Sequence, residues 1–160
     1  SKNPIIISGG GVFYSNAMEE LSNFAIKHNI PVTQTVMGYS TMKRDHTHYA
    51  GQIGGLGGKN TNDLAKETDL AIAIGTKLGD FTTGSWANFE NENFKLVSIN
   101  VSRFDANKHL AQAVIGDAKV SLIELSKSDI DSLPSFSDTY FSTRVSNQSK
   151  ESIAKVFLLL

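Results

Sequence analysis

Glycine-bearing segments that follow apolar runs are the first candidates for chemistry in this sequence. They are residues 9–11, residues 75–84 and Gly116-Asp117. In open parallel sheets, ligands bind beyond the carboxyl ends of the strands, where these segments would lie. Glycine lets backbone N–H groups approach a phosphate, and the amino terminus of a following helix adds a favourable field. These segments are therefore candidates for nucleotide contact, and for residues 9–11 a tight turn of positive φ is an equal alternative.

These segments do not complete a known nucleotide motif. Residues 9–14 begin as Gly-x-Gly, but Tyr14 stands where the dinucleotide fingerprint has its third glycine. No lysine follows in P-loop spacing, and the glycines between residues 51 and 58 fit either an anion cradle or a flexible crossover. His46 and His48 are two residues apart without further ligands nearby, which favours a solvated or hydrogen-bonded pair over a metal site. The sequence assigns no catalytic residue and no metal ligand.

The elements that must position these loops alternate between strands and helices. Strands are expected at residues 4–8, 31–36, 70–74, 95–101 and 113–115, and helices at 17–28, 61–67 and 118–127, with 37–60 irregular. Asn16 with Glu19 forms a candidate capping box for the first helix, and Asp117 can cap the last. This alternation predicts an α/β fold, an open doubly wound parallel sheet of about six strands with helices on both faces. We expect a nucleotide-binding-like domain over residues 1–128, and a linker with a C-terminal helix over 129–160.

Composition limits the functions that this chain can have. Its 160 residues are 40% hydrophobic with a net charge of −1, which suits one globular domain. The charges form no basic stripe, so nucleic acid is not an expected partner, and no apolar run is long enough to cross a membrane. The absence of cysteine excludes disulfides and thiolate sites and fits a cytoplasmic protein. Because the sequence begins at Ser1 without a methionine, we expect a piece of a longer chain.

Five segments, in their order and spacing, resemble a known family. They read PIIISGGGV, IPVTQTVMGYSTM, DLAIAIGTKLGDFTTGSW, SINVSRFDANKH and VIGDAKVSL. Together they resemble the central domain of thiamin diphosphate (ThDP) enzymes of the acetolactate synthase and pyruvate oxidase type. The resemblance covers residues 4 to about 127.

The resemblance implies that the catalytic machinery lies outside this chain. In the family, the first domain supplies a glutamate that activates ThDP, and the third supplies a Gly-Asp-Gly motif for Mg²⁺ and the diphosphate. This sequence has no such motif, since Gly79-Asp80 is followed by Phe81. The resemblance therefore implies ThDP and Mg²⁺ bound elsewhere in a parent enzyme. Its implied partners are the other domains of the same polypeptide, in a homo-oligomer.

Two segments narrow the resemblance within the family. FTTGSW at residues 81–86 and FDANKH at residues 104–109 are most similar to a member that hydrolyses a carbon–carbon bond of a cyclic dione in myo-inositol catabolism. The resemblance makes Thr82, Thr83, Ser85 and Trp86 candidates for the wall of a substrate channel. For Trp86 the alternative is a surface plug or interface anchor. Two other functions stay open for this protein. It could be the central domain of an acetolactate synthase-like carboligase, or a free-standing nucleotide-binding or interaction module without enzymatic activity.

Some relatives bind FAD or ADP in this domain, and their contacts can be carried over by position. They would fall on Gly54, Gly55, Gly75, Thr76, Lys77, Asn100, Val101, Asp117 and Ala118. Two departures weigh against such binding here. Lys77 replaces an arginine and loses its planar fork. Asn100 and Ser102 stand where those relatives carry aspartates, so a carboxylate acceptor for ribose is missing.

Overall fold

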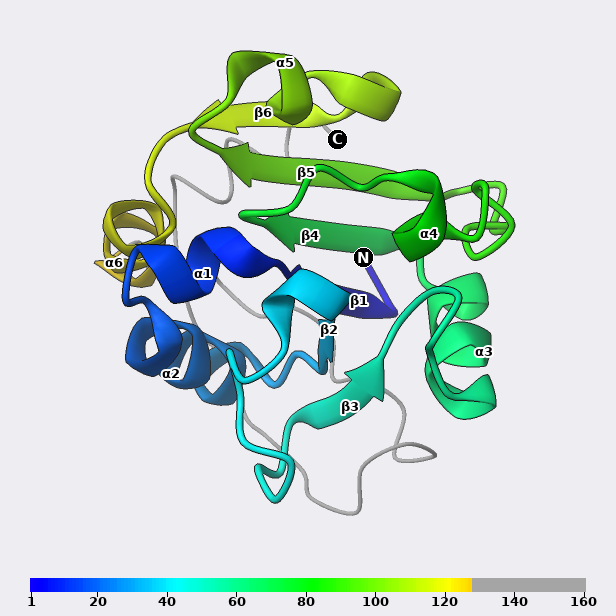
Figure 1. Cartoon of the computed structure of the whole chain (residues 1–160), viewed down its shortest axis with the longest axis horizontal. Helices are drawn as coiled ribbons and strands as arrows, with labels where there is room; N and C mark the ends of the chain where they lie inside the picture. The colour runs from blue at the N-terminus through cyan, green and yellow to red at the C-terminus, as the bar shows by residue number, and fades with distance from the viewer. Residues whose placement is uncertain (128–160) are drawn as a thin grey trace.

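The computed structural model describes residues 1–127 (Figure 1). The linker and helix predicted for residues 129–160, and the domain boundary at 128, lie outside the described residues. The last described helix ends at Lys127, as the sequence predicts.

The centre of the described chain is a six-stranded sheet in which every pairing is parallel. The strands are β1 (Pro4–Ser8), β2 (Val32–Gln34), β3 (Tyr49–Gln52), β4 (Leu70–Ile74), β5 (Lys95–Asn100) and β6 (Gln112–Ile115), in the order β3-β2-β1-β4-β5-β6. The central strands β1 and β4 are continuous apolar runs because helices or loops cover both of their faces. The predicted fold class is confirmed.

Helices flank the sheet on both sides. They are α1 (Gly10–Tyr14), α2 (Met18–His28), η1 (Val36–Gly38), α3 (Lys59–Glu67), α4 (Asp80–Thr83), α5 (Arg103–Ala106), η2 (Lys108–Leu110) and α6 (Ala118–Lys127). Figure 1 shows α1, α2 and α6 on one side of the sheet and α3 and α4 on the other. Within residues 1–127, no helix has both the length and the apolarity needed to cross a membrane.

Alternate residues of β1 enter two separate cores. Ile6 packs with Leu21 and Phe24 of α2 in one core. Ile5 and Ile7 point to the other face, where they join the cluster that holds Leu64 of α3. All three isoleucines are fully buried, and each such side chain stabilises the fold by about 1.5–3 kcal/mol. A doubly wound sheet has helices on both faces, and each face here has its own hydrophobic core.

The strand order places a topological switch point between β1 and β4. From β1 the chain winds outward through β2 to β3, and it then returns to β4 beside β1 and winds the other way. The loops that leave β1 and β4 therefore diverge to opposite faces and open a crevice at the carboxyl ends of these strands.

Three local expectations were wrong. The second strand ends at Gln34, and residues 36–38 form η1 because the Thr35 hydroxyl accepts a hydrogen bond from the Gly38 N–H. The stretch 37–60 contains a strand, β3, which is half-buried and so lacks an apolar signature. Asn16 does not cap α2. It adopts φ +52° in the turn after α1, and Ala17 is the N-cap without a side-chain bond.

Asp117 caps the last helix, as predicted. Its carboxylate accepts hydrogen bonds from the backbone N–H groups of Lys119 at 2.9 Å and Val120 at 3.1 Å. These are two of the donors that a helix leaves unsatisfied at its amino terminus.

Candidate functional site

Two backbones cross in close contact at the switch point. The Gly11 N–H donates to the Gly75 carbonyl at 2.9 Å. A Cβ on Gly11 would lie 2.6 Å from Gly75 Cα, and a Cβ on Gly9 would lie 2.4 Å from Gly75 O. Glycines 9–11 do not adopt positive φ, so that sequence-based alternative was wrong. They are needed because a second backbone approaches them, and Gly75 itself has φ +61°.

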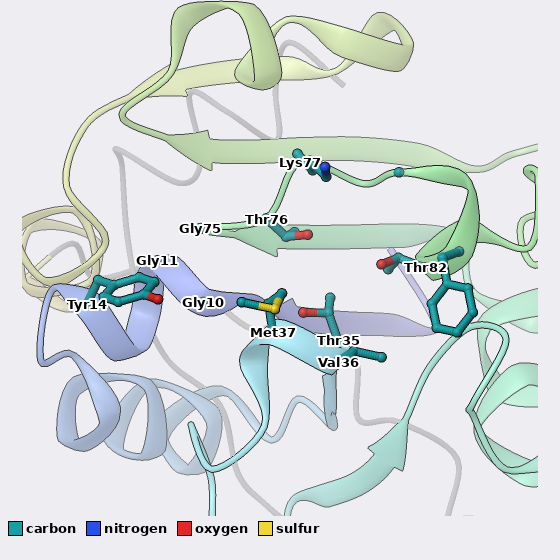
Figure 2. Close-up of a pocket in the computed structure, with 12 residues that line it drawn as sticks. Gly10, Gly11, Tyr14, Thr35, Val36, Met37, Gly75, Thr76, Lys77 and Thr82 are labelled. Atoms are coloured by element: carbon teal, nitrogen blue, oxygen red, sulfur yellow. The ribbon is translucent and has the colours of Figure 1, made fainter.

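A cleft opens beside this crossing, between the segments that follow β1, β2 and β4. Its main part has a volume of about 350 Å³ and is lined by Gly10, Gly11, Tyr14, Thr35, Val36, Met37, Gly75, Thr76, Lys77, Gly79, Phe81 and Thr82 (Figure 2). A second part of about 250 Å³ shares Gly11, Tyr14 and Gly75 with the first. We call the two parts together the switch-point cleft. Its size is that of a small-molecule site.

The cleft brings together most of the residues predicted for nucleotide contact. Gly75, Thr76 and Lys77 line the first part, and Asn100, Val101, Asp117 and Ala118 line the second. Gly54 and Gly55 line a different pocket, on the side of α3. The Gly55 N–H instead donates to the Phe81 carbonyl at 2.8 Å, which fastens the loop before α3 to α4.

Sequence reasoning missed the part of the cleft that comes from α1 and η1. Tyr14 is 79% exposed and Met37 is 70% exposed, and both line the cleft with Val36 and Thr35. Figure 2 shows these side chains across the opening from Thr76 and Thr82. The signal was available in the strand order, because β2 ends beside β1 and its exit loop must lie at the same edge. The prediction of a strand up to Val36 hid it.

Asn100 ties the ends of two strands together. Its side-chain Nδ2 donates to the Thr76 carbonyl at 3.0 Å, and its Oδ1 accepts from the Ser102 N–H at 3.0 Å. An aspartate at this position has no N–H to give to Thr76, so only an amide serves both partners. This double role accounts for asparagine where the nucleotide-binding relatives of the resemblance carry a carboxylate.

Positive charge lies near one mouth of the cleft. Lys77 is exposed there, and Lys108 forms an ion pair of 2.6 Å with Asp105 on α5. The hydrogen bond from Lys108 lowers the pKa of the Asp105 carboxyl below its ordinary value, and the charge of Lys77 adds a weaker effect of the same sign. Asp105 is thus an anion that accompanies the two lysines.

The four substrate-channel candidates do not share one surface. Thr82 lines the cleft. Thr83 is buried, and its hydroxyl accepts from the Trp86 N–H at 3.2 Å. Ser85 is exposed. Trp86 is half-buried and stacks on His109 with ring centroids 4.2 Å apart.

The histidine pair of residues 46 and 48 is hydrogen-bonded, as the sequence favours. His46 Nε2 lies 2.9 Å from the Ser22 hydroxyl, and His48 Nε2 lies 3.0 Å from Asn29 Oδ1. The His48 backbone N–H donates to His46 Nδ1 at 3.1 Å. Within residues 1–127, no three histidine, aspartate or glutamate side chains are grouped so that they could hold a metal ion.

Comparison with known proteins gives one family model and a set of relatives that match most of this chain. The family model described as "Thiamine pyrophosphate enzyme, central domain" matches residues 1–125. The 3D-(3,5/4)-trihydroxycyclohexane-1,2-dione hydrolase of Clostridium perfringens (strain 13 / Type A) is 47% identical over 124 residues, which are 78% of this chain and 19% of that protein. The corresponding hydrolase 2 of a Bacillus cereus strain is also 47% identical, and that of Bacillus anthracis is 46% identical, with the same coverage. The chain thus spans about a fifth of the length of the curated relatives it matches.

Proposed function

Because this chain belongs to the central-domain family of thiamine pyrophosphate enzymes, we propose that it is the central, non-catalytic domain of a hydrolase that opens the trihydroxycyclohexane-dione ring. The names of the matched relatives carry this proposal, since each one cited above is this hydrolase. They favour it over a carboligase of the acetolactate synthase type. The parent enzyme is proposed to act in the cytoplasm in myo-inositol degradation, as a homo-oligomer.

Two observations support placing ThDP and Mg²⁺ outside this chain. The diphosphate of ThDP needs a divalent cation, and Mg²⁺ prefers carboxylate and carbonyl oxygens in near-octahedral geometry. Within residues 1–127 no three histidine, aspartate or glutamate side chains are grouped to hold a metal ion, and the sequence lacks the Gly-Asp-Gly motif. We therefore place ThDP and Mg²⁺ in other domains of the parent enzyme, and we assign to this chain scaffold and subunit contacts. The cleft wall at Thr82 is a candidate boundary of the substrate channel.

The isolated chain is expected to have no hydrolase activity. The test incubates this chain with ThDP, Mg²⁺ and the cyclic dione, beside the full-length Clostridium perfringens relative as a positive control. Release of the ring-opened acid is followed in both. Turnover by this chain alone would contradict its non-catalytic role. A parent enzyme that contains this chain and condenses pyruvate, but leaves the dione intact, would contradict the substrate assignment.

Flavin binding in the switch-point cleft is expected to be weak or absent. Lys77 offers a point charge in place of a bidentate fork, and both polar ends of Asn100 are used by the backbone. Equilibrium dialysis against FAD, and separately against ADP, measures this directly. The Lys77→Ala variant is the matched control, because binding in the cleft depends on that charge and adventitious binding does not. A purified chain that stays yellow through dialysis would refute the expectation.

A further inference from the structure

The two sequence segments that narrow the resemblance within the family meet in the structure. Trp86 ends FTTGSW and His109 ends FDANKH, and their rings stack at 4.2 Å with planes 24° apart. His109 Nε2 also lies 3.1 Å from the Leu78 carbonyl, to which it donates. His109 therefore holds both ends of the segment 78–86, which we call the strap.

The strap and its partner loop are held in unusual backbone conformations. Leu78, Ser85 and Trp86 have φ of +46°, +51° and +75°, and His109 and Leu110 have φ of +58° and +57°. A bulky residue rarely adopts this region, and it stays there only where surrounding contacts hold it. The ring stack and the bond to the Leu78 carbonyl are two of those contacts. The others include the packing of Trp86 against Phe89 and Phe94 and the burial of Leu78.

The strap forms one wall of the switch-point cleft. Gly79, Phe81 and Thr82 line the cleft from the strap, and Phe81 is 56% exposed. The middle of the strap is fastened at its back, where the Gly55 N–H donates to the Phe81 carbonyl. The position of this wall relative to Tyr14 and Met37 across the cleft therefore depends on how both strap ends are held.

We infer that His109 is a positioning residue for the switch-point cleft. Its ring and its Nε2–H keep the strap in the path seen here, and the strap in turn sets the width of the cleft at Phe81. Loss of the stack lets the strap leave this path while the sheet stays folded. This role goes beyond the proposed function, and it does not depend on which ligand or domain covers the cleft.

Trypsin cleavage can detect movement of the strap away from the sheet, because the exposed Lys77 immediately precedes the strap. In the His109→Asn variant, we expect cleavage after Lys77 to accelerate on the order of tenfold, since an aromatic stack and a hydrogen bond are lost together. Asparagine tolerates positive φ, so the change removes the ring without adding backbone strain. Cleavage after Lys66 in α3 is the internal reference and should keep its rate.

A double-mutant cycle decides whether the two rings act as a unit. Trp86→Leu should accelerate cleavage after Lys77 less than His109→Asn does, because the bond from His109 to the Leu78 carbonyl stays, and the double variant should be no faster than His109→Asn. As the only tryptophan of the chain, Trp86 should also become more accessible to a soluble quencher in His109→Asn. Unchanged cleavage after Lys77 would overturn the inference. Equal acceleration at Lys77 and Lys66, with a lowered melting temperature, would overturn it as well, because it would show a general loss of stability.

Discussion

The Gly75→Ala variant is expected to lose about 3 kcal/mol or more of unfolding free energy, enough to unfold a marginally stable domain. Two causes act together. Gly75 has φ +61°, which disfavours any residue with a Cβ. A Cβ there would also lie 2.6 Å from Gly11 Cα and 2.9 Å from Val12 N, both backbone atoms that cannot rotate away. The crossing of the β1 and β4 exit segments would have to open.

Matched variants separate these causes. Gly79→Ala lies in the same loop, where its Cβ would meet only the end of the Lys77 side chain at 3.7 Å, and we expect a change within about 0.5 kcal/mol. Gly75→Asn tolerates the positive φ but keeps the clash. Denaturant unfolding followed by circular dichroism measures all three. If Gly75→Asn matched the wild type, the close approach of the two backbones would not be the reason for glycine.

The buried strands and the edge that binds ligands are the parts of the fold that the sequence predicts well. Buried parallel strands must be apolar on both faces, so apolar runs such as residues 4–8 and 70–74 can be predicted as strands from a single sequence. Once strands alternate with helices, the ligand edge follows from topology. The carried-over positions at residues 75–77 and 100–101 reach the cleft for this reason.

What the sequence hides is local conformation without a burial pattern. The strand β3 reads Tyr-Ala-Gly-Gln and is half-buried throughout, so neither alternation nor an apolar run marks it. The short helix α1 begins within three glycines, which are poor helix formers and here serve the backbone crossing. The stack of Trp86 on His109 joins two loops that have no period at all. Such contacts depend on tertiary packing, and only coordinates reveal them.

Acidification is expected to destabilise the domain through a buried histidine. His28 ends α2, is 7% exposed, and packs its ring against Phe24 at a centroid distance of 4.5 Å. Burial, with a smaller contribution from the charge of Lys27, lowers the pKa of His28 from its ordinary 6.5 to about 4. The neutral ring is therefore the form that the folded core accepts.

Proton binding by the unfolded chain sets the direction in which stability changes with pH. Between pH 6.5 and pH 4 the unfolded chain binds a proton at His28 and the folded chain does not, so the unfolding free energy falls as the pH falls. The contribution of His28 is complete above pH 6.5 and is lost through this window, on the order of 3 kcal/mol in total. His48 adds a loss of the same sign, because burial lowers its pKa too. Asp69 and Asp105 also have lowered pKa values, but their loss of stability falls near and below the ordinary pKa of an aspartate. The loss in the upper part of the pH window therefore comes from the histidines.

The His28→Phe variant isolates this effect from packing. Its unfolding free energy should fall less steeply between pH 6.5 and pH 5 than that of the wild type, whatever its absolute stability at pH 7. Phe24→Leu is the control, because it weakens the same contact without removing a titratable group and should keep the wild-type slope. Urea unfolding at a series of pH values measures both. A wild-type slope in His28→Phe would mean that His28 is protonated in the folded core, and that the core opens to solvent at this end of α2.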